Sequence, residues 1–179
     1  MEENAASKSK IGYVKAVAAL LLAAYFFWTA FRPVDFRFID YVNLIFHEAG
    51  HVIFAFFGNF MSIAGGTIMQ LAIPALCAMY FYTHGQRYSA GLVLFWLGES
   101  FVNVSIYAAD ARLMLLPLLG GDSVIHDWNE MLTITNLLPY AEAISSSIRL
   151  LGVLTMICAL CLSLRYSFKK EVGNHLMDF

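Results

Sequence analysis

The chain has 179 residues, which is enough for one compact domain rather than two. Its residues are 60% hydrophobic and only 13% charged, about half of the charged fraction of soluble domains. This composition excludes an ordinary soluble protein and predicts a lipid bilayer as the surroundings. The formal net charge of −2 gives no reason to expect a nucleic-acid partner.

The apolar segments, taken in chain order, predict an all-α polytopic membrane protein. A spanning helix needs about 20 apolar residues. Five segments satisfy this as clear spans: 11–31, 38–57, 61–82, 88–109 and 145–166. We expect Gly58-Asn59 to end the second of these in a tight turn. We therefore expect one helical membrane domain over residues 11–166, with a polar tail at 1–10 and another at 167–179. The run after the first tail is too long for the core of a signal peptide.

A broken or re-entrant element is predicted near residues 113–127. This segment is too short to span and contains a proline and paired glycines, which interrupt helices. Asp127, with Glu130 three residues later, resembles an N-cap with its capping partner and predicts a helix over 128–143. That helix is a weak sixth span.

The distribution of basic residues predicts the orientation of the chain. Lysines precede and begin the first span, and Arg165, Lys169 and Lys170 close the last one. The positive-inside rule therefore predicts that both termini are cytoplasmic, which requires an even number of crossings. We expect about six spans, and the short loops favour a prokaryotic plasma (inner) membrane.

The second predicted span contains the motif His47-Glu48-Ala49-Gly50-His51. Residues four apart lie on one face of a helix, so His47 and His51 can direct both imidazoles at one metal ion. Glu48 can reach a water on that ion as a general base. Ionisable groups at membrane depth are costly, and their default interpretation is a functional site.

A catalytic zinc ion takes three protein ligands and keeps one position for water. The third ligand must come from elsewhere in the chain, and the candidates are His126, Asp127, Asp122, Asp110 and Glu99. His126 and Asp127 are favoured because they open a helix after a glycine-rich break. His126 would bind as a neutral imidazole, whereas Asp127 could bind directly or orient another ligand.

A polar stripe follows one face of the fourth predicted span. Glu99, Asn103, Tyr107 and Asp110 are spaced four, four and three residues apart, so they face protein or a cavity rather than lipid. Hydrogen bonds between helices are the simplest role for such a stripe. The Asn103 amide is also a catalytic candidate, because a buried amide can hold a substrate carbonyl or a developing oxyanion.

The sequence His-Glu-Ala-Gly-His in a membrane helix resembles the site-2 protease family of intramembrane zinc metalloproteases, whose motif helix often reads His-Glu-x-Gly-His. The resemblance implies that His47 and His51 bind zinc and that Glu48 activates water. In that family the third ligand is an aspartate within an Asn-Pro-Asp-Gly or Leu-Asp-Gly pattern. Neither pattern occurs here, so the choice between His126 and Asp127 stays open.

Together these patterns predict a membrane zinc hydrolase, with Zn²⁺ as cofactor and a membrane protein or peptide as substrate. The expected reaction is hydrolysis of a peptide bond within or near the membrane by water that Glu48 activates. Two alternatives remain: a membrane zinc hydrolase of a lipid amide or ester, and a non-catalytic scaffold that retains the metal motif.

Overall fold

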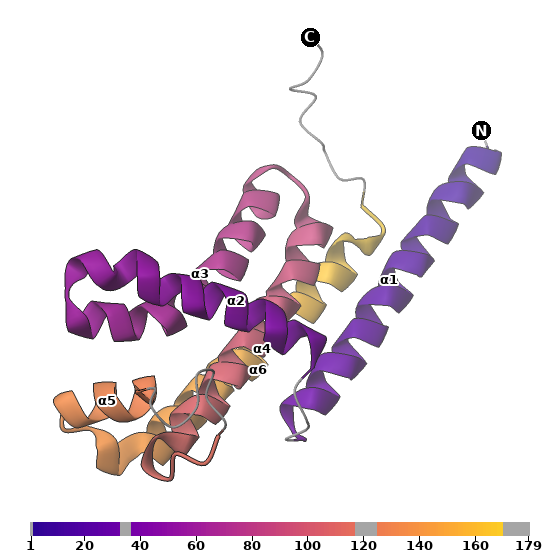
Figure 1. The fold of residues 1–179 in the computed structure, drawn as a ribbon. Helices are drawn as coiled ribbons and strands as arrows, with labels where there is room; N and C mark the ends of the chain where they lie inside the picture. The colour runs from indigo at the N-terminus through magenta and orange to yellow at the C-terminus, as the bar shows by residue number, and fades with distance from the viewer. Residues whose placement is uncertain (1, 33–36, 117–124, 170–179) are drawn as a thin grey trace. The chain divides into compact units, whose positions relative to one another are not determined.

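A computed structural model describes residues 2–32, 37–116 and 125–169, and within these ranges the chain forms helices and no strands (Figure 1). The α-helices in these ranges are α1 (Glu2–Ala30), α2 (Phe38–Phe54), α3 (Asn59–Thr83), α4 (Arg87–Ala109), α5 (Asp127–Ile134) and α6 (Ala141–Ser167). The short 3₁₀ helices in the same ranges are η1 (Ala55–Phe57), η2 (Asp110–Arg112) and η4 (Leu138–Tyr140). The all-α prediction is confirmed.

Four helices in the described part of the chain are long and apolar enough to cross a membrane: α1, α3, α4 and α6. Helix α2 has 17 residues and α5 has only 8, both fewer than the about 20 that a crossing requires. The expected count of about six spans is therefore not confirmed. Helix α1 begins at Glu2, inside the expected polar tail, and residues 170–179 of the other tail lie outside the described ranges.

The chain divides into two compact units. The first unit contains α1, the part of α3 from Pro74, the part of α4 up to Glu99, and the part of α6 from Val153. Small buried side chains of α1 let α4 approach, and the Phe26 and Phe95 rings stack with centroids 5.9 Å apart. This unit is an ordinary packing core of long helices.

The second unit contains α2, α5, the first part of α3, the second part of α4 and the first part of α6. A sharp turn at Gly58, where φ is +97°, reverses the chain between η1 and α3. That backbone region favours glycine, so the expected turn at this residue is found. Helices α2 and α3 consequently form a close antiparallel pair (Figure 1).

Around α5 the chain differs in detail from the predicted helix over 128–143. His126, not Asp127, is the N-cap, and its Nδ1 accepts a hydrogen bond from the backbone N–H of Asn129 at 3.2 Å. Helix α5 ends at Ile134, because Asn136 takes a left-handed conformation with φ of +59°. Within the expected broken element, residues 113–116 and 125–126 are non-helical, and residues 117–124 lie outside the described ranges.

Candidate metal centre

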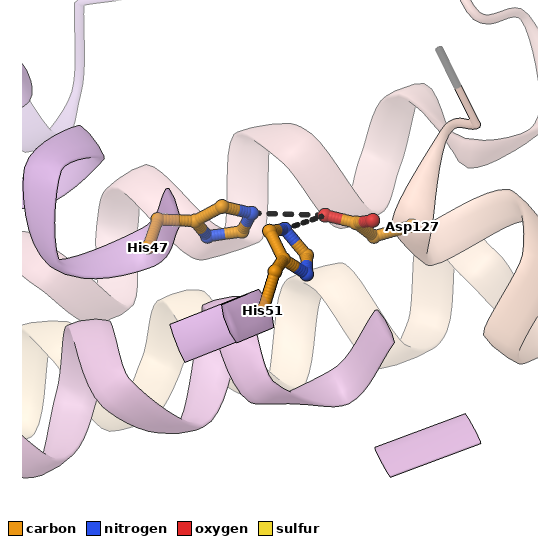
Figure 2. Close-up of side chains that lie close together, drawn as sticks. All are labelled: His47, His51 and Asp127. Atoms are coloured by element: carbon orange, nitrogen blue, oxygen red, sulfur yellow. Dashed lines mark hydrogen bonds and ion pairs between the residues drawn. The ribbon is translucent and has the colours of Figure 1, made fainter. Parts of the chain in front are cut away.

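The second unit brings His47, His51 and Asp127 together (Figure 2). The two histidines lie one turn apart on α2, and Asp127 is the first residue of α5. Oδ2 of Asp127 lies 2.9 Å from Nε2 of His47 and 3.3 Å from Nε2 of His51. The three candidate ligand atoms all lie within 4.8 Å of one another, so they suit a single small cation.

Helix α3 provides a hydrogen-bond partner for the Nδ1 atom of each imidazole. Nδ1 of His47 lies 3.2 Å from Oε1 of Gln70, and Nδ1 of His51 lies 2.8 Å from the carbonyl oxygen of Ser62. The Ser62 hydroxyl also donates a hydrogen bond to the carbonyl oxygen of His51, at 3.1 Å. Partners on Nδ1 orient each ring so that Nε2 faces Asp127, which is the arrangement that metal-binding histidines need.

Charge and burial favour an ion pair at this position. His47 and Asp127 are each only 7% exposed. The hydrogen bond to the Asp127 carboxylate raises the pKa of His51 from 6.5 to about 9, although burial of the ring acts in the opposite direction. Burial alone would raise the pKa of the Asp127 carboxyl, but its bonds to the two histidines outweigh burial and lower it. The cluster therefore holds a carboxylate ready for a cation.

Glycines leave the space that this geometry needs. A Cβ added at Gly66 would lie 2.5 Å from Nε2 of His47, so the absence of a side chain there makes room for the ring. Gly50 and Gly65 meet backbone to backbone where α2 and α3 cross, and a Cβ at either would overlap the other. Both histidines can therefore lie against α3 without separating the helices.

Of the four predicted metal ligands, His126 lies apart from the other three. Its Nε2 is 3.3 Å from Oδ2 of Asp110, and its Nδ1 caps α5. Since Nδ1 accepts a hydrogen bond from the backbone N–H of Asn129, Nε2 must be the protonated nitrogen that donates to Asp110. Of the other candidates, Asp110 accepts bonds from His126 and from two backbone N–H groups.

Asp122 lies outside the described residues, and Glu99 is buried in the first unit. Asp127 is thus the candidate that meets the histidines.

Glu48 is exposed, and its carboxylate is one of the charges that raise the pKa of His51. Asn103 lies in a hydrogen-bonded chain: its Oδ1 accepts from Nε2 of Gln70, and its Nδ2 donates to Oδ1 of Asp40, both at 2.8 Å. The amide predicted to hold a substrate carbonyl is therefore bonded at both ends to protein groups.

Sequence reasoning missed Gln70 and Ser62 as partners of the histidines. The signal that could have found Gln70 is its place as a single amide in a long apolar segment, because such a group requires a buried partner. Tyr107, recognised only as a member of the polar stripe, accepts a hydrogen bond at its hydroxyl from the backbone N–H of Asp127, at 3.1 Å. It thereby helps to place Asp127.

Comparisons with known proteins add no further information, since no protein-family model, curated protein or solved structure matches this chain.

Proposed function

We propose that the protein is a zinc-dependent membrane hydrolase, an intramembrane metalloprotease distantly similar to the site-2 proteases. The observation that carries the proposal is the convergence of His47, His51 and Asp127, whose ligand atoms lie within 4.8 Å of one another. Chance clustering explains poorly why the histidines belong to an HExxH motif and why both have their second nitrogen occupied.

The donor set suits zinc. Two imidazole nitrogens and one carboxylate oxygen are ligands that zinc accepts, and three protein ligands leave one position for water, as in catalytic rather than structural sites. Calcium and magnesium prefer sites made of oxygen ligands. In this proposal His47, His51 and Asp127 hold the ion, and His126 supports Asp127 by capping α5.

The proposed chemistry needs one more residue, Glu48. A zinc ion bound here would acidify a water molecule and polarise a carbonyl group. The Glu48 carboxylate takes a proton from the attacking water while the oxygen of that water bonds to the carbonyl carbon. It then delivers that proton to the leaving nitrogen as the C–N bond breaks. Glu48 is exposed in the structure, which suits a group that must meet a substrate.

A basic end of the first unit supports the proposed orientation of the chain. The Tyr88 hydroxyl, at the start of α4, donates to the carbonyl oxygen of Lys15 in α1, and Arg87 donates to the Tyr166 hydroxyl at the end of α6. Lys169 also lies over the Tyr166 ring. Cations and tyrosines at one level are typical of a cytoplasmic membrane interface. We therefore infer that both termini are cytoplasmic, and the short loops favour a plasma (inner) membrane of prokaryotic type.

Four spans have a consequence for the site. The segment with α2 lies between the first and second spans, and the segment with α5 lies between the third and fourth. An even number of crossings separates these two segments, so both lie on the side opposite the termini. The proposed site is then open to peptide bonds in the outer half of the bilayer or just above it.

The test is a comparison of wild type with Glu48→Gln and His47→Ala, each purified in detergent and reconstituted into vesicles. The probe is a set of transmembrane peptides carrying a quenched fluorophore pair, with phospholipid hydrolysis followed in the same vesicles. We expect wild type and Glu48→Gln to bind one zinc ion, His47→Ala to lose it, and only wild type to cleave peptide. Equal cleavage by wild type and Glu48→Gln would refute the mechanism, and release of fatty acid without peptide cleavage would change the substrate class to lipid.

A further inference from the structure

Three side chains form a continuous hydrogen-bonded path behind His47. We call Asp40, Asn103 and Gln70 the amide relay. Asp40 Oδ1 bonds to Asn103 Nδ2 at 2.8 Å, Asn103 Oδ1 bonds to Gln70 Nε2 at 2.8 Å, and Gln70 Oε1 lies 3.2 Å from His47 Nδ1. Asp40 and Gln70 are buried, and the relay joins α2, α4 and α3 within the second unit. No water is needed to complete it.

The chemistry of Asp40 gives this path a direction. Its Oδ2 accepts a hydrogen bond from the backbone N–H of Arg37 at 2.7 Å, at the first turn of α2, where a negative charge is favoured. A carboxylate only accepts, so Asn103 must turn its NH₂ group towards Asp40 and its oxygen towards Gln70. Gln70 must then turn its NH₂ group towards Asn103 and its oxygen towards His47.

The end of the path determines where the His47 proton lies. Because Gln70 presents an oxygen, Nδ1 of His47 must carry a proton, and Nε2, which donates to Oδ2 of Asp127 in the metal-free protein, is the nitrogen left for a metal ion. A metal ion that displaces the proton between Nε2 and Asp127 gains the Nε2 lone pair, which it needs because a protonated nitrogen cannot ligate.

We infer that Asp40 sets the tautomer of His47 through the amide relay, so that Asp40, Asn103 and Gln70 are positioning residues of the proposed metal site. The inference deepens the proposed function and rests on it only where zinc binding is the readout. Among the described residues, Asp40 is hydrogen-bonded to the Arg37 N–H and to Asn103 and not to the histidines or Asp127. Its effect is transmitted by the two amides, each of which has one donor end and one acceptor end.

The Asp40→Asn variant reverses the donor-to-acceptor direction of the hydrogen bonds in the amide relay without changing the shape of the side chains. The new asparagine has one oxygen, and the Arg37 N–H at the helix start requires it. Its NH₂ group then faces Asn103, which satisfies its hydrogen bonds only by exchanging its oxygen and nitrogen. Gln70 must exchange in turn and offer NH₂ to His47, so that Nδ1 loses its proton and becomes the acceptor, while Nε2 keeps the proton that it donates to Asp127. Every hydrogen bond is kept, but the lone pair of His47 then lies on Nδ1 and faces away from the site.

A second carboxylate further along the relay restores the original direction. In Asp40→Asn with Asn103→Asp, the acceptor-only group moves to position 103, and Gln70 again turns its oxygen to His47. In Asp40→Asn with Gln70→Glu, a carboxylate faces Nδ1 directly and the proton returns there. Each double variant satisfies all donors and acceptors, so both act as matched rescues that preserve the volume of every side chain.

The single variants Asn103→Asp and Gln70→Glu provide the opposite test. Each adds a second acceptor-only group to a relay that already contains Asp40, and this forces two oxygens into contact without a proton between them. We expect both to lower the midpoint of thermal unfolding and to weaken zinc binding. Adding Asp40→Asn to either variant should restore both the unfolding midpoint and the zinc affinity. In each double variant, one substitution therefore suppresses the effect of the other.

Two measurements decide the inference. Zinc affinity is obtained by competition with a chromophoric chelator in detergent, and Nδ1 protonation of His47 is read from the ¹⁵N resonances of metal-free, histidine-labelled protein. The His47 signals are identified by their loss in His47→Gln. We expect a protonated Nδ1 in wild type and in both double variants, and an unprotonated Nδ1 in Asp40→Asn. Zinc affinity should fall about 10- to 100-fold in Asp40→Asn and recover to within about threefold of wild type in the rescues.

Either of two results would overturn the inference: an Asp40→Asn protein with the wild-type Nδ1 signal, or a loss of zinc affinity that neither double variant restores. The second result would mean that Asp40 only caps α2. If wild type binds no zinc while the nitrogen resonances change as expected, the relay stands and the proposed function fails. If Asp40→Asn does not fold, the suppression of Gln70→Glu by Asp40→Asn in the double variant still decides the outcome.

Discussion

Gly66 is the position where a single methyl group tests the packing of the site most directly. A Cβ built there would lie 2.5 Å from Nε2 and 2.7 Å from Cε1 of His47. Carbon atoms in contact prefer separations of about 3.5–4.0 Å, so the ring must move by about 1 Å in Gly66→Ala. That movement breaks the bond between Nδ1 and Gln70, because donor and acceptor already lie 3.2 Å apart.

The cost can be worked out from two opposing terms. Overpacking typically destabilises by about 1–3 kcal/mol, whereas replacing glycine by alanine inside a helix contributes about 0.5–1 kcal/mol. Gly66→Ala should therefore lower the free energy of unfolding by about 0–2.5 kcal/mol in wild type. In a His47→Ala background the clash is absent, and the same change should stabilise by about 0.5–1 kcal/mol. The coupling between the two sites is then about 1–3 kcal/mol.

The assay is a double-mutant cycle, with reversible unfolding in SDS followed by helical circular dichroism. Gly65→Ala is the matched control: its Cβ would meet the backbone oxygen of Gly50, so it should destabilise in both backgrounds. Zinc affinity of Gly66→Ala should fall at least about tenfold, because metal–ligand distances tolerate only about 0.2 Å of change. If the Gly66 and His47 substitutions are additive within about 0.5 kcal/mol, the proposed packing of the ring against Gly66 is wrong.

Four further predictions concern the site and its orientation. The Asp127 carboxylate raises the pKa of His51 to about 9, so zinc must displace a proton from His51 below that pH. Zinc affinity, measured by competition with a chelator, should therefore rise by up to about tenfold per pH unit from about pH 6.5 to 9 and then level off. Because the pKa of His51 is raised in the folded protein, the ion pair of His51 with Asp127 stabilises the metal-free protein fully below about pH 6.5, and this stabilisation is lost as the pH rises through 9. The midpoint of thermal unfolding should fall over this range, and a midpoint that does not change with pH would contradict the prediction. Asp127→Ala should abolish zinc binding by metal analysis, whereas His126→Ala should keep the ion but lower stability by about 0.5–2 kcal/mol through loss of the α5 cap; equal zinc loss in both would contradict the assignment. In protein whose native cysteines are replaced, a single cysteine at His84 should react with an impermeant maleimide only from the cytoplasmic side and one at Phe56 only from the other side, and labelling of both from one side would refute the four-span orientation.

The amino-acid sequence by itself determined the features that depend on composition and on neighbours along one helix. An apolar chain with few charges predicts membrane helices, and all four of the long helices were expected within a few residues except at the start of α1. The juxtaposition of His47 and His51 follows from helical periodicity alone. Gly58 was likewise recognisable as a turn, because few other residues adopt its backbone conformation.

Only the tertiary structure decided which residues far away in sequence lie beside His47 and His51. His126 and Asp127 are adjacent in sequence, but neighbouring residues at a helix start point in directions about 100° apart, so one caps α5 and the other meets the histidines. Residues 38–57 are mostly apolar, so their pattern could not reveal that α2 is shorter than a span. The turn after η1, which folds the chain back so that α2 lies against α3, is a feature of the tertiary structure. The apolar surroundings of Gln70 show only that its amide requires a buried partner. The neighbours of Gln70 and Asp40 in sequence do not show which partner each has, since the hydrogen bonds that connect them to His47 cross between three helices. Periodicity within one helix is a local property, whereas the third ligand and the amide relay depend on contacts between residues far apart in sequence.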